Sequence, residues 1–247
     1  MKRLACIIFL SLTLVSCKKD TVPDDPQPGR QLPDSLLNRL IAVSNFGEAP
    51  PDGNGSNPML PTLYYSLERR RPVPADSLNT SAWDLSFSNL FRSFINCNNT
   101  SSGGKGAGGI LIVEKKFEEV VDIPADELFR TGEKAYGTDD AGAFGEGVGW
   151  YIYDFDGTRL RSGAYDDAHV AYPMNEALTI KRGDETSFIT QPRTILVRTA
   201  HGHYAKLRIL SIYKDKTDPS TWHRNDDKPY FTFEYVLANA GSKRFSK

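Results

Sequence analysis

The stretch TILVRTAHGHYAKLRIL, at residues 194–210, indicates the fold. It contains two apolar runs, over residues 194–199 and 204–210, with a turn at His201-Gly202 between them. In the second run apolar and polar residues alternate, and a period of two is typical of a half-buried β-strand. Two such runs joined by a short glycine-containing turn predict a β-hairpin.

Strand-like patterns recur along much of the chain outside this hairpin. They lie at residues 63–67, 83–88, 91–97, 109–113, 150–155 and 231–237. Asp156-Gly157 is a strong hairpin signal, so we expect residues 158–160 to return beside the preceding strand. Helical spacing is confined to residues 35–43 and 125–129, and strands do not alternate with helices as in a parallel sheet. The sequence therefore predicts an all-β, antiparallel domain with one or two short helices.

The composition is that of an ordinary globular protein. The 247 residues are 39% hydrophobic and 25% charged, which allows a sizeable core in one large domain. The 30 Lys and Arg residues nearly balance the 31 Asp and Glu residues, for a net charge of −1. Because such a chain has no long-range positive field, we do not expect it to bind nucleic acid.

The first 17 residues resemble a bacterial lipoprotein signal. A basic start, Met1-Lys2-Arg3, precedes an apolar segment over residues 4–14, and Leu14-Val15-Ser16-Cys17 closes it. A segment this short is typical of a secretory leader rather than a transmembrane helix. We expect residues 1–16 to be removed and Cys17 to be acylated, so that its lipid chains anchor the protein to a membrane. The alternative is a secretory signal in which the cysteine has no such role.

A tether is expected between the lipid and the folded domain. Residues 18–32 are charged and proline-rich, which is typical of an extended linker. An N-capping aspartate and an apolar stripe predict a short helix over residues 35–43. Glycine and proline are again frequent over residues 46–59. We therefore expect a lipidated tether over residues 17–59 and a compact β domain over residues 60–240.

Two side chains are expected in the core of that domain. Trp83 alternates with apolar residues, which places its indole on the buried face of a strand. Cys97 is the only cysteine left once Cys6 leaves with the leader and Cys17 carries lipid, so no intramolecular disulfide can form. Cys97 lies in a strand-like run, which favours a small buried side chain over a reactive thiol.

No catalytic signature is present in the sequence. It contains no Gly-x-Ser-x-Gly, His-Glu-x-x-His or Cys-x-x-Cys motif. The glycine-rich segment 103–109 lacks P-loop spacing and fits a tight connection between strands. Arg182-Gly183-Asp184 matches an adhesion tripeptide, but a turn is needed there in any case. We therefore expect a binding protein rather than an enzyme.

The four histidines fall into two groups. His201, His203 and His223 lie in turns or polar loops. Exposure to solvent is favoured there over a metal-binding pair of His201 and His203, because no acidic or cysteine partner is nearby in the sequence. His169 lies with Met174 in a long connection over residues 161–192, and long ordered connections often carry function.

Several sequence blocks occur in a fixed order along residues 60–238. They are TSAWDL at 80–85, Arg92 followed by Asn96-Cys97, GKGAGG at 104–109, RTILVRTAHGHYAK at 193–206 and YFTFEY at 230–235. Together they resemble the HmuY family of haem-binding surface lipoproteins. The resemblance implies an all-β fold and a lipid anchor in the outer membrane at the cell surface. It also implies capture of haem from haemoproteins and its delivery to a TonB-dependent outer-membrane receptor.

The haem ligands of the family do not transfer residue by residue. The resemblance implies two histidine ligands, or methionines in some relatives, and places the second near Lys181 or Arg182, which do not bind iron at neutral pH. The chemistry of iron favours His169 and Met174 as axial ligands, with two tyrosines as further candidates, Tyr165 and Tyr172. A surface module that binds glycan or protein on the same β scaffold, without haem, is the alternative.

Overall fold

The computed structural model describes residues 31–48, 59–131, 148–181 and 186–245. The expected leader and Cys17 lie outside these residues. Within them, no helix is long and apolar enough to cross a bilayer. Every helix in the described ranges is a 3-10 turn of three residues: η1 Ala75–Ser77, η2 Thr100–Ser102, η3 Phe117–Glu119, η4 Asp126–Leu128, η5 Tyr165–Asp167 and η6 Pro219–Thr221. The predicted all-β, antiparallel class is confirmed.

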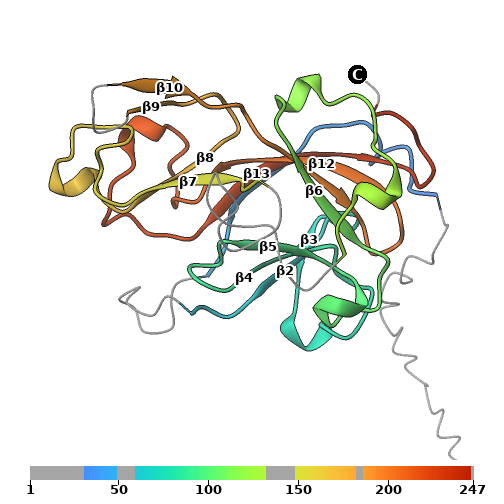
Figure 1. Ribbon diagram of the computed structural model, residues 1–247. Coiled ribbons are helices and arrows are strands. Elements are labelled where there is room, and N and C mark those ends of the chain that lie inside the picture. Colours follow the sequence, from blue (N-terminus) through green and yellow to red (C-terminus); the bar gives the residue numbers. More distant parts are fainter. Residues whose placement is uncertain (1–30, 49–58, 132–147, 182–185, 246–247) are drawn as a thin grey trace, which may run out of the picture.

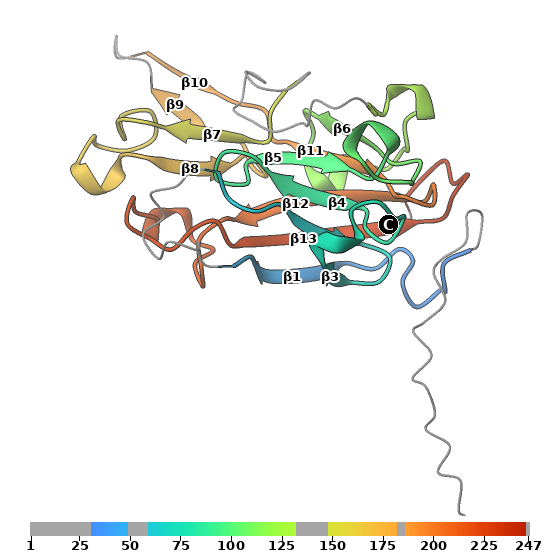
Figure 2. The ribbon, with the colours of Figure 1, turned by 90° about the horizontal axis from the view of Figure 1, so that it is seen from below.

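The larger sheet has five antiparallel strands, which Figures 1 and 2 show side by side. Their order is β1 (Ile41–Phe46), β13 (Phe231–Ala238), β12 (Tyr204–Ser211), β11 (Thr194–Arg198) and β6 (Gly109–Val113). The hairpin predicted from residues 194–210 joins β11 to β12, with Val197 opposite Ala205 and Ile195 opposite Leu207.

A second, four-stranded sheet packs against the first, below β12 and β13 in Figure 1. Its order is β3 (Arg71–Val73), β2 (Leu63–Ser66), β4 (Leu85–Ser88) and β5 (Phe94–Cys97). Aromatic rings fill the space between the sheets. The ring centroids of Phe87 and Phe231 are 4.0 Å apart, and those of Tyr65 and Phe233 are 5.4 Å apart. The core therefore lies between two stacked sheets.

Two further hairpins extend from one side of this sandwich, at the left of Figure 1. One pairs β7 (Tyr151–Asp154) with β8 (Val170–Pro173), and the other pairs β9 (Thr179–Lys181) with β10 (Ser187–Ile189). The connection over residues 161–192 thus contains three strands of its own.

The helix expected over residues 35–43 is wrong. A short turn comes first, and β1 follows it. In β1, Ile41 pairs with Tyr235 of β13 and Val43 pairs with Phe233. A helix of nine residues is marginal by itself, whereas the open edge of β13 offers a row of backbone partners. Phe46 is buried in the core, so the folded domain begins before residue 60.

The strand expected over residues 158–160 is also wrong. Asp154 is buried, and its carboxylate accepts hydrogen bonds from the backbone N–H groups of Arg159 and Leu160 at 3.2 and 3.0 Å. These N–H groups therefore face a side chain rather than a neighbouring strand. β7 pairs instead with β8, and Val170, the first residue of β8, comes 16 residues after Asp154.

Both expected core side chains are buried. Trp83 is 1% exposed, and its Nε1 donates to Leu78 O at 2.9 Å. Cys97 is fully buried, and burial raises its pKa to about 12, so the thiol stays protonated at neutral pH.

The glycine-rich segment wraps around Asn98. The Asn98 side chain donates to Thr80 O and Trp83 O and accepts from the Gly106 N–H at 2.8 Å. A Cβ on Gly108 would lie 2.5 Å from Asn98 O, so only glycine fits there. The segment is therefore a tight connection from β5 to β6.

Candidate functional site

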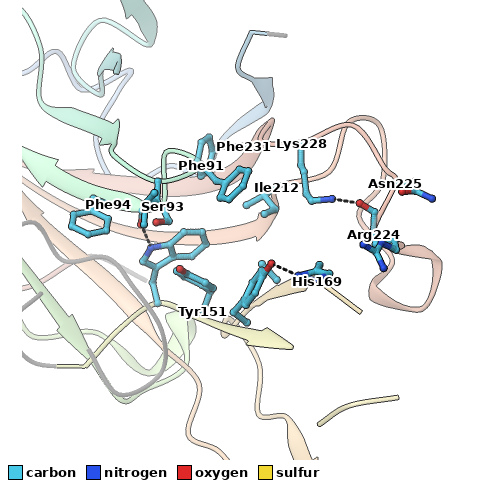
Figure 3. A pocket seen from close by; sticks show the side chains of 14 residues that line it. Phe91, Ser93, Phe94, Tyr151, His169, Ile212, Arg224, Asn225, Lys228 and Phe231 are labelled. Atoms are coloured by element: carbon cyan, nitrogen blue, oxygen red, sulfur yellow. Dashed lines mark hydrogen bonds between the residues drawn. The ribbon is translucent and has the colours of Figure 1, made fainter. Parts of the chain in front are cut away.

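A cavity of about 590 Å³ opens beside the β7–β8 hairpin, at the end of the sandwich. This volume is within the range of small-molecule sites. Figure 3 shows the lining side chains around a common space. They are mostly aromatic or apolar: Leu90, Phe91, Ser93, Phe94, Trp150, Tyr151, Tyr153, His169, Ala171, Ile212, Arg224, Asn225, Lys228 and Phe231.

Alternation along β7 and β8 gives this hairpin a pocket face and a buried face. Tyr153, His169 and Ala171 line the pocket. Ile152 and Met174 lie on the other face, in a small apolar cluster. His169 directly precedes β8 and Met174 directly follows it, and their surroundings place them on different faces.

His169 lies just before β8 and is half-buried. Its Nδ1 is 2.9 Å from the Tyr153 hydroxyl oxygen, the dashed contact in Figure 3, and the Phe155 ring meets the imidazole edge-on. Burial raises the pKa of Tyr153, which keeps the hydroxyl neutral. When Nδ1–H donates to that oxygen, Nε2 carries the lone pair that can bind a metal.

The backbone at His169 is in the left-handed region, with a φ of 59°. For a residue other than glycine this conformation costs about 1–2 kcal/mol. The His169 N–H donates to Phe155 O at 3.2 Å, which ties this strained residue to the end of β7.

Segment 89–93 forms the wall opposite the hairpin. Phe91 and Arg92 have φ values of 49° and 56°, and the Arg92 side chain is turned inward, with 1% exposure. The Arg92 Nε donates to Pro61 O at 2.8 Å. Because this turn directs Arg92 into the protein, it leaves Phe91 44% exposed at the mouth of the pocket.

Two cationic side chains line the third side. The Arg224 guanidinium lies 4.0 Å from the centroid of the Tyr165 ring. Lys228 Nζ donates to the backbone oxygens of Arg224 and Asp226, and burial lowers the pKa of Lys228. The pocket therefore combines an apolar interior, one imidazole and two basic groups, which suits a flat apolar ligand that carries an anionic group.

No family model and no curated protein matches the sequence. Among solved structures, the chain is similar to one from Bacteroides vulgatus described as a HmuY-like heme binding protein, with 12% identity and a TM-score of 0.35 over 85% of this chain and 97% of that chain.

Two further solved structures are similar. One is the apo HmuY analog of Tannerella forsythia, with 14% identity and a TM-score of 0.36 over 81% of this chain and 97% of that chain. The other is a chain from Bacteroides fragilis described as a lipoprotein, with 15% identity and a TM-score of 0.31 over 71% of this chain and 83% of that chain. Two of the three structures carry the name of the family that the sequence blocks resemble.

The structure separates the two main candidate ligands. His169 faces the pocket, whereas Met174 is fully buried on the far face of the hairpin beside Ile152 and Ile180. Lys181 ends β9, and Arg182 lies outside the described residues.

The two candidate tyrosines are not among the lining residues. Tyr165 is 70% exposed and lies under Arg224, at the rim. Tyr172 is buried against Trp222, and burial raises its pKa to about 12, which opposes formation of a tyrosinate.

Sequence reasoning missed several pocket residues. The alternation over residues 150–155 could have placed Tyr151 and Tyr153 on one face. No sequence signal could have brought Arg224 and Lys228 to that face, because they come from a loop about 70 residues away along the chain.

A buried polar cluster lies elsewhere in the sandwich and corrects the expected exposure of two histidines. His201 is 7% exposed and His203 is fully buried. His201 Nδ1 is 2.9 Å from Glu68 Oε2, and Asp84 lies next to them. Turn residues are usually solvated, but here the hairpin tip folds onto the second sheet and acquires a buried partner.

The electrostatics of this cluster are unusual. Burial and the neighbouring Glu68 charge raise the pKa of Asp84 to about 7. Burial opposes the ionisation of Glu68 as well, but hydrogen bonds from His201 and Thr199, together with the positive charge of His201, outweigh it and lower the Glu68 pKa. Two carboxyl groups thus lie close to one imidazole, and Glu68 is the one hydrogen-bonded to it.

Proposed function

We propose that this chain is a non-enzymatic surface lipoprotein that binds haem, or a related iron tetrapyrrole, in the pocket beside the β7–β8 hairpin. The observation that carries the proposal is an imidazole at the wall of an aromatic cavity, with two basic groups along another side. A haem molecule offers a flat apolar ring, an iron that accepts imidazole, and carboxylates at one edge. Each has a counterpart among the lining residues.

His169 is the iron ligand in this proposal. The contact with Tyr153 fixes the ring orientation, and a ligating histidine commonly donates its other N–H to such a partner. Met174 lies on the other face of the hairpin, which gives no support to a His169–Met174 pair. We therefore assign one ligand among the described residues.

Arg224 and Lys228 would hold the carboxylates. Both line the pocket, and an anion beside Lys228 would favour its charged form, against the effect of burial on its pKa. The aromatic side chains would cover the ring faces and exclude water from the iron.

Export, anchoring and delivery complete the proposal. The leader and Cys17 would place the protein on the outer membrane at the cell surface. From there, haem taken from haemoproteins would pass to a TonB-dependent receptor, as the resemblance to the HmuY family implies.

A haemin titration tests the proposal. A chain that begins at Lys18 lacks the leader and Cys17 but keeps every described residue. We expect it to shift the Soret band of haemin, and we expect His169→Ala to change the band and weaken binding. Met174→Ala should leave the spectrum unchanged, and His223→Ala, in an exposed loop, is the matched control.

The outcomes separate the possibilities. If His169→Ala binds haemin with the wild-type spectrum and affinity, His169 is not the ligand. If the wild-type chain does not bind haemin, the haem proposal is wrong.

A second candidate function is binding of a glycan or protein at the same place. It is favoured by exposed aromatic rings that contact the lining residues His169 and Arg224, because sugars and proteins pack on such rings: Phe155 is 67% exposed and Tyr165 is 70% exposed. This candidate predicts that Phe155→Ala abolishes binding of the glycan or protein. His169→Ala removes no exposed aromatic ring and should weaken that binding less.

A further inference from the structure

The buried polar cluster lies away from the pocket, at the opposite end of β4. Asp84 comes immediately before β4, whereas the pocket segment 89–93 follows it. Glu68 follows β2, and His201 lies in the turn between β11 and β12. Three segments from two sheets thus meet at one point.

The ligating atoms of the cluster are close together. One atom each from Glu68, Asp84 and His201 lie within 4.8 Å of one another. All three residues are more than nine-tenths buried, with exposures of 5%, 1% and 7%.

Asp84 is held in place by its neighbours. One carboxylate oxygen accepts from the Ala200 N–H at 3.0 Å, and the other accepts from Ser66 Oγ at 3.1 Å and the Glu68 N–H at 3.3 Å. Outer-shell hydrogen bonds of this kind orient the carboxylates of metal sites.

The cluster places two carboxyl groups beside one imidazole in the buried interior, where a charge without a partner is costly. Glu68 Oε1 is buried and has no hydrogen-bond partner of standard geometry in the described ranges, although the neighbouring Thr199 hydroxyl helps to lower the Glu68 pKa. A divalent cation would neutralise both carboxylates and would give this oxygen a partner.

We propose that Glu68, Asp84 and His201 form a binding site for a divalent transition-metal cation of the zinc class. An imidazole nitrogen with two carboxylate oxygens suits Zn²⁺, whereas Ca²⁺ and Mg²⁺ prefer oxygen ligands in larger numbers. The metal takes the place of the proton between His201 Nδ1 and Glu68 Oε2, and that proton is released. The site is independent of the proposed haem function.

Metal binding here would connect the two sheets. Glu68 and Asp84 belong to the second sheet and His201 to the first, so a bound ion fixes the β11–β12 turn onto β2 and β4. Because the unfolded chain does not hold these groups together, the ion stabilises the folded state by mass action.

The test uses the full chain without an affinity tag, stripped of metal and then mixed with Zn²⁺ or Co²⁺. We expect one Zn²⁺ per chain by native mass spectrometry, visible absorption bands from bound Co²⁺, and a higher melting temperature. Glu68→Gln and His201→Gln should each weaken Zn²⁺ binding by more than about 100-fold, beyond the loss of an outer-shell partner. His169→Ala is the matched control and should bind one Zn²⁺ as before, because its imidazole lies in the pocket.

Two results would overturn the proposal. One is a wild-type chain that retains no Zn²⁺. The other is Zn²⁺ binding of normal strength in both glutamine variants, with loss in His169→Ala. If a glutamine variant fails to fold, NMR of the wild-type chain decides: Co²⁺ must broaden the amide signals of Glu68 and Ala200, and broadening confined to residues around His169 contradicts the site.

Discussion

The indole of Trp83 packs against the glycine-rich segment 103–109. It lies edge-on to the Tyr64 ring, with centroids 4.9 Å apart, and its N–H is satisfied by Leu78 O. Truncating a buried aromatic side chain of this size leaves a cavity and an unpaired carbonyl. We expect Trp83→Ala to lower the free energy of unfolding by about 3–5 kcal/mol, measured by urea denaturation. Trp83→Phe should cost less, and a loss below about 1 kcal/mol for the alanine variant would contradict the buried position.

Tyr153 is the partner that orients His169. Tyr153→Phe removes the hydroxyl 2.9 Å from Nδ1 while keeping the aromatic wall. If haemin binds through His169, we expect this variant to bind it about 10-fold more weakly, the lower range for losing an outer-shell partner. Tyr151→Phe, on the same face of β7, is the control and should bind haemin as the wild type does. Equal affinities for the two variants would show that the hydroxyl plays no part.

At the scale of elements, β1 decides where the domain begins. It covers the edge of β13 and buries Phe46 between the sheets. We expect a chain that begins at residue 60 to lose at least about 2 kcal/mol of stability, because burial of one aromatic side chain contributes about that much. A chain that begins at residue 31 should be as stable as the wild type. Equal urea midpoints for the two truncated chains would restore the interpretation of residues 17–59 as a tether.

At the scale of the whole molecule, the proposed attachment to the membrane would depend on one atom. The Cys17 thiol is the expected site of acylation, so Cys17→Ser should move the protein from the detergent phase to the aqueous phase in a partition assay. The lipid chains supply the affinity for the bilayer, and serine cannot form the thioether that carries one of them. A serine variant that still fractionates with membranes would contradict the lipoprotein interpretation.

The parts of this molecule that could be predicted from sequence are those encoded by neighbouring residues. The alternation over residues 204–210 and 231–237 gave the central strands, and the position of Trp83 in its run gave its burial. β1 could not be recognised because its short apolar stripe fits both a helical period and a strand period. Only pairing with the open edge of β13 favours the strand over the helix.

The candidate sites depend on contacts between distant residues. His201 and Glu68 are 133 residues apart in the chain, so nothing near His201 reveals that its side chain is buried. The pocket brings together residues 90–94, 150–153, 169–171 and 224–231 in the same way. His169 could be found because it lies in a long connection, whereas its separation from Met174 required the register of β7 and β8.

The placement of the three tryptophans gives the protein an internal optical reporter. Trp150 lines the pocket, with its Nε1 bonded to Ser93 O at 2.8 Å, whereas Trp83 and Trp222 are buried outside the lining. Haem accepts excitation energy from indoles over long distances, so it should quench the fluorescence of all three. A colourless glycan should change the emission of Trp150 alone. In a Trp150→Phe chain the quenching by haem should survive, whereas the emission change caused by a glycan should vanish. This difference distinguishes the two candidate ligands without any assumption about the iron.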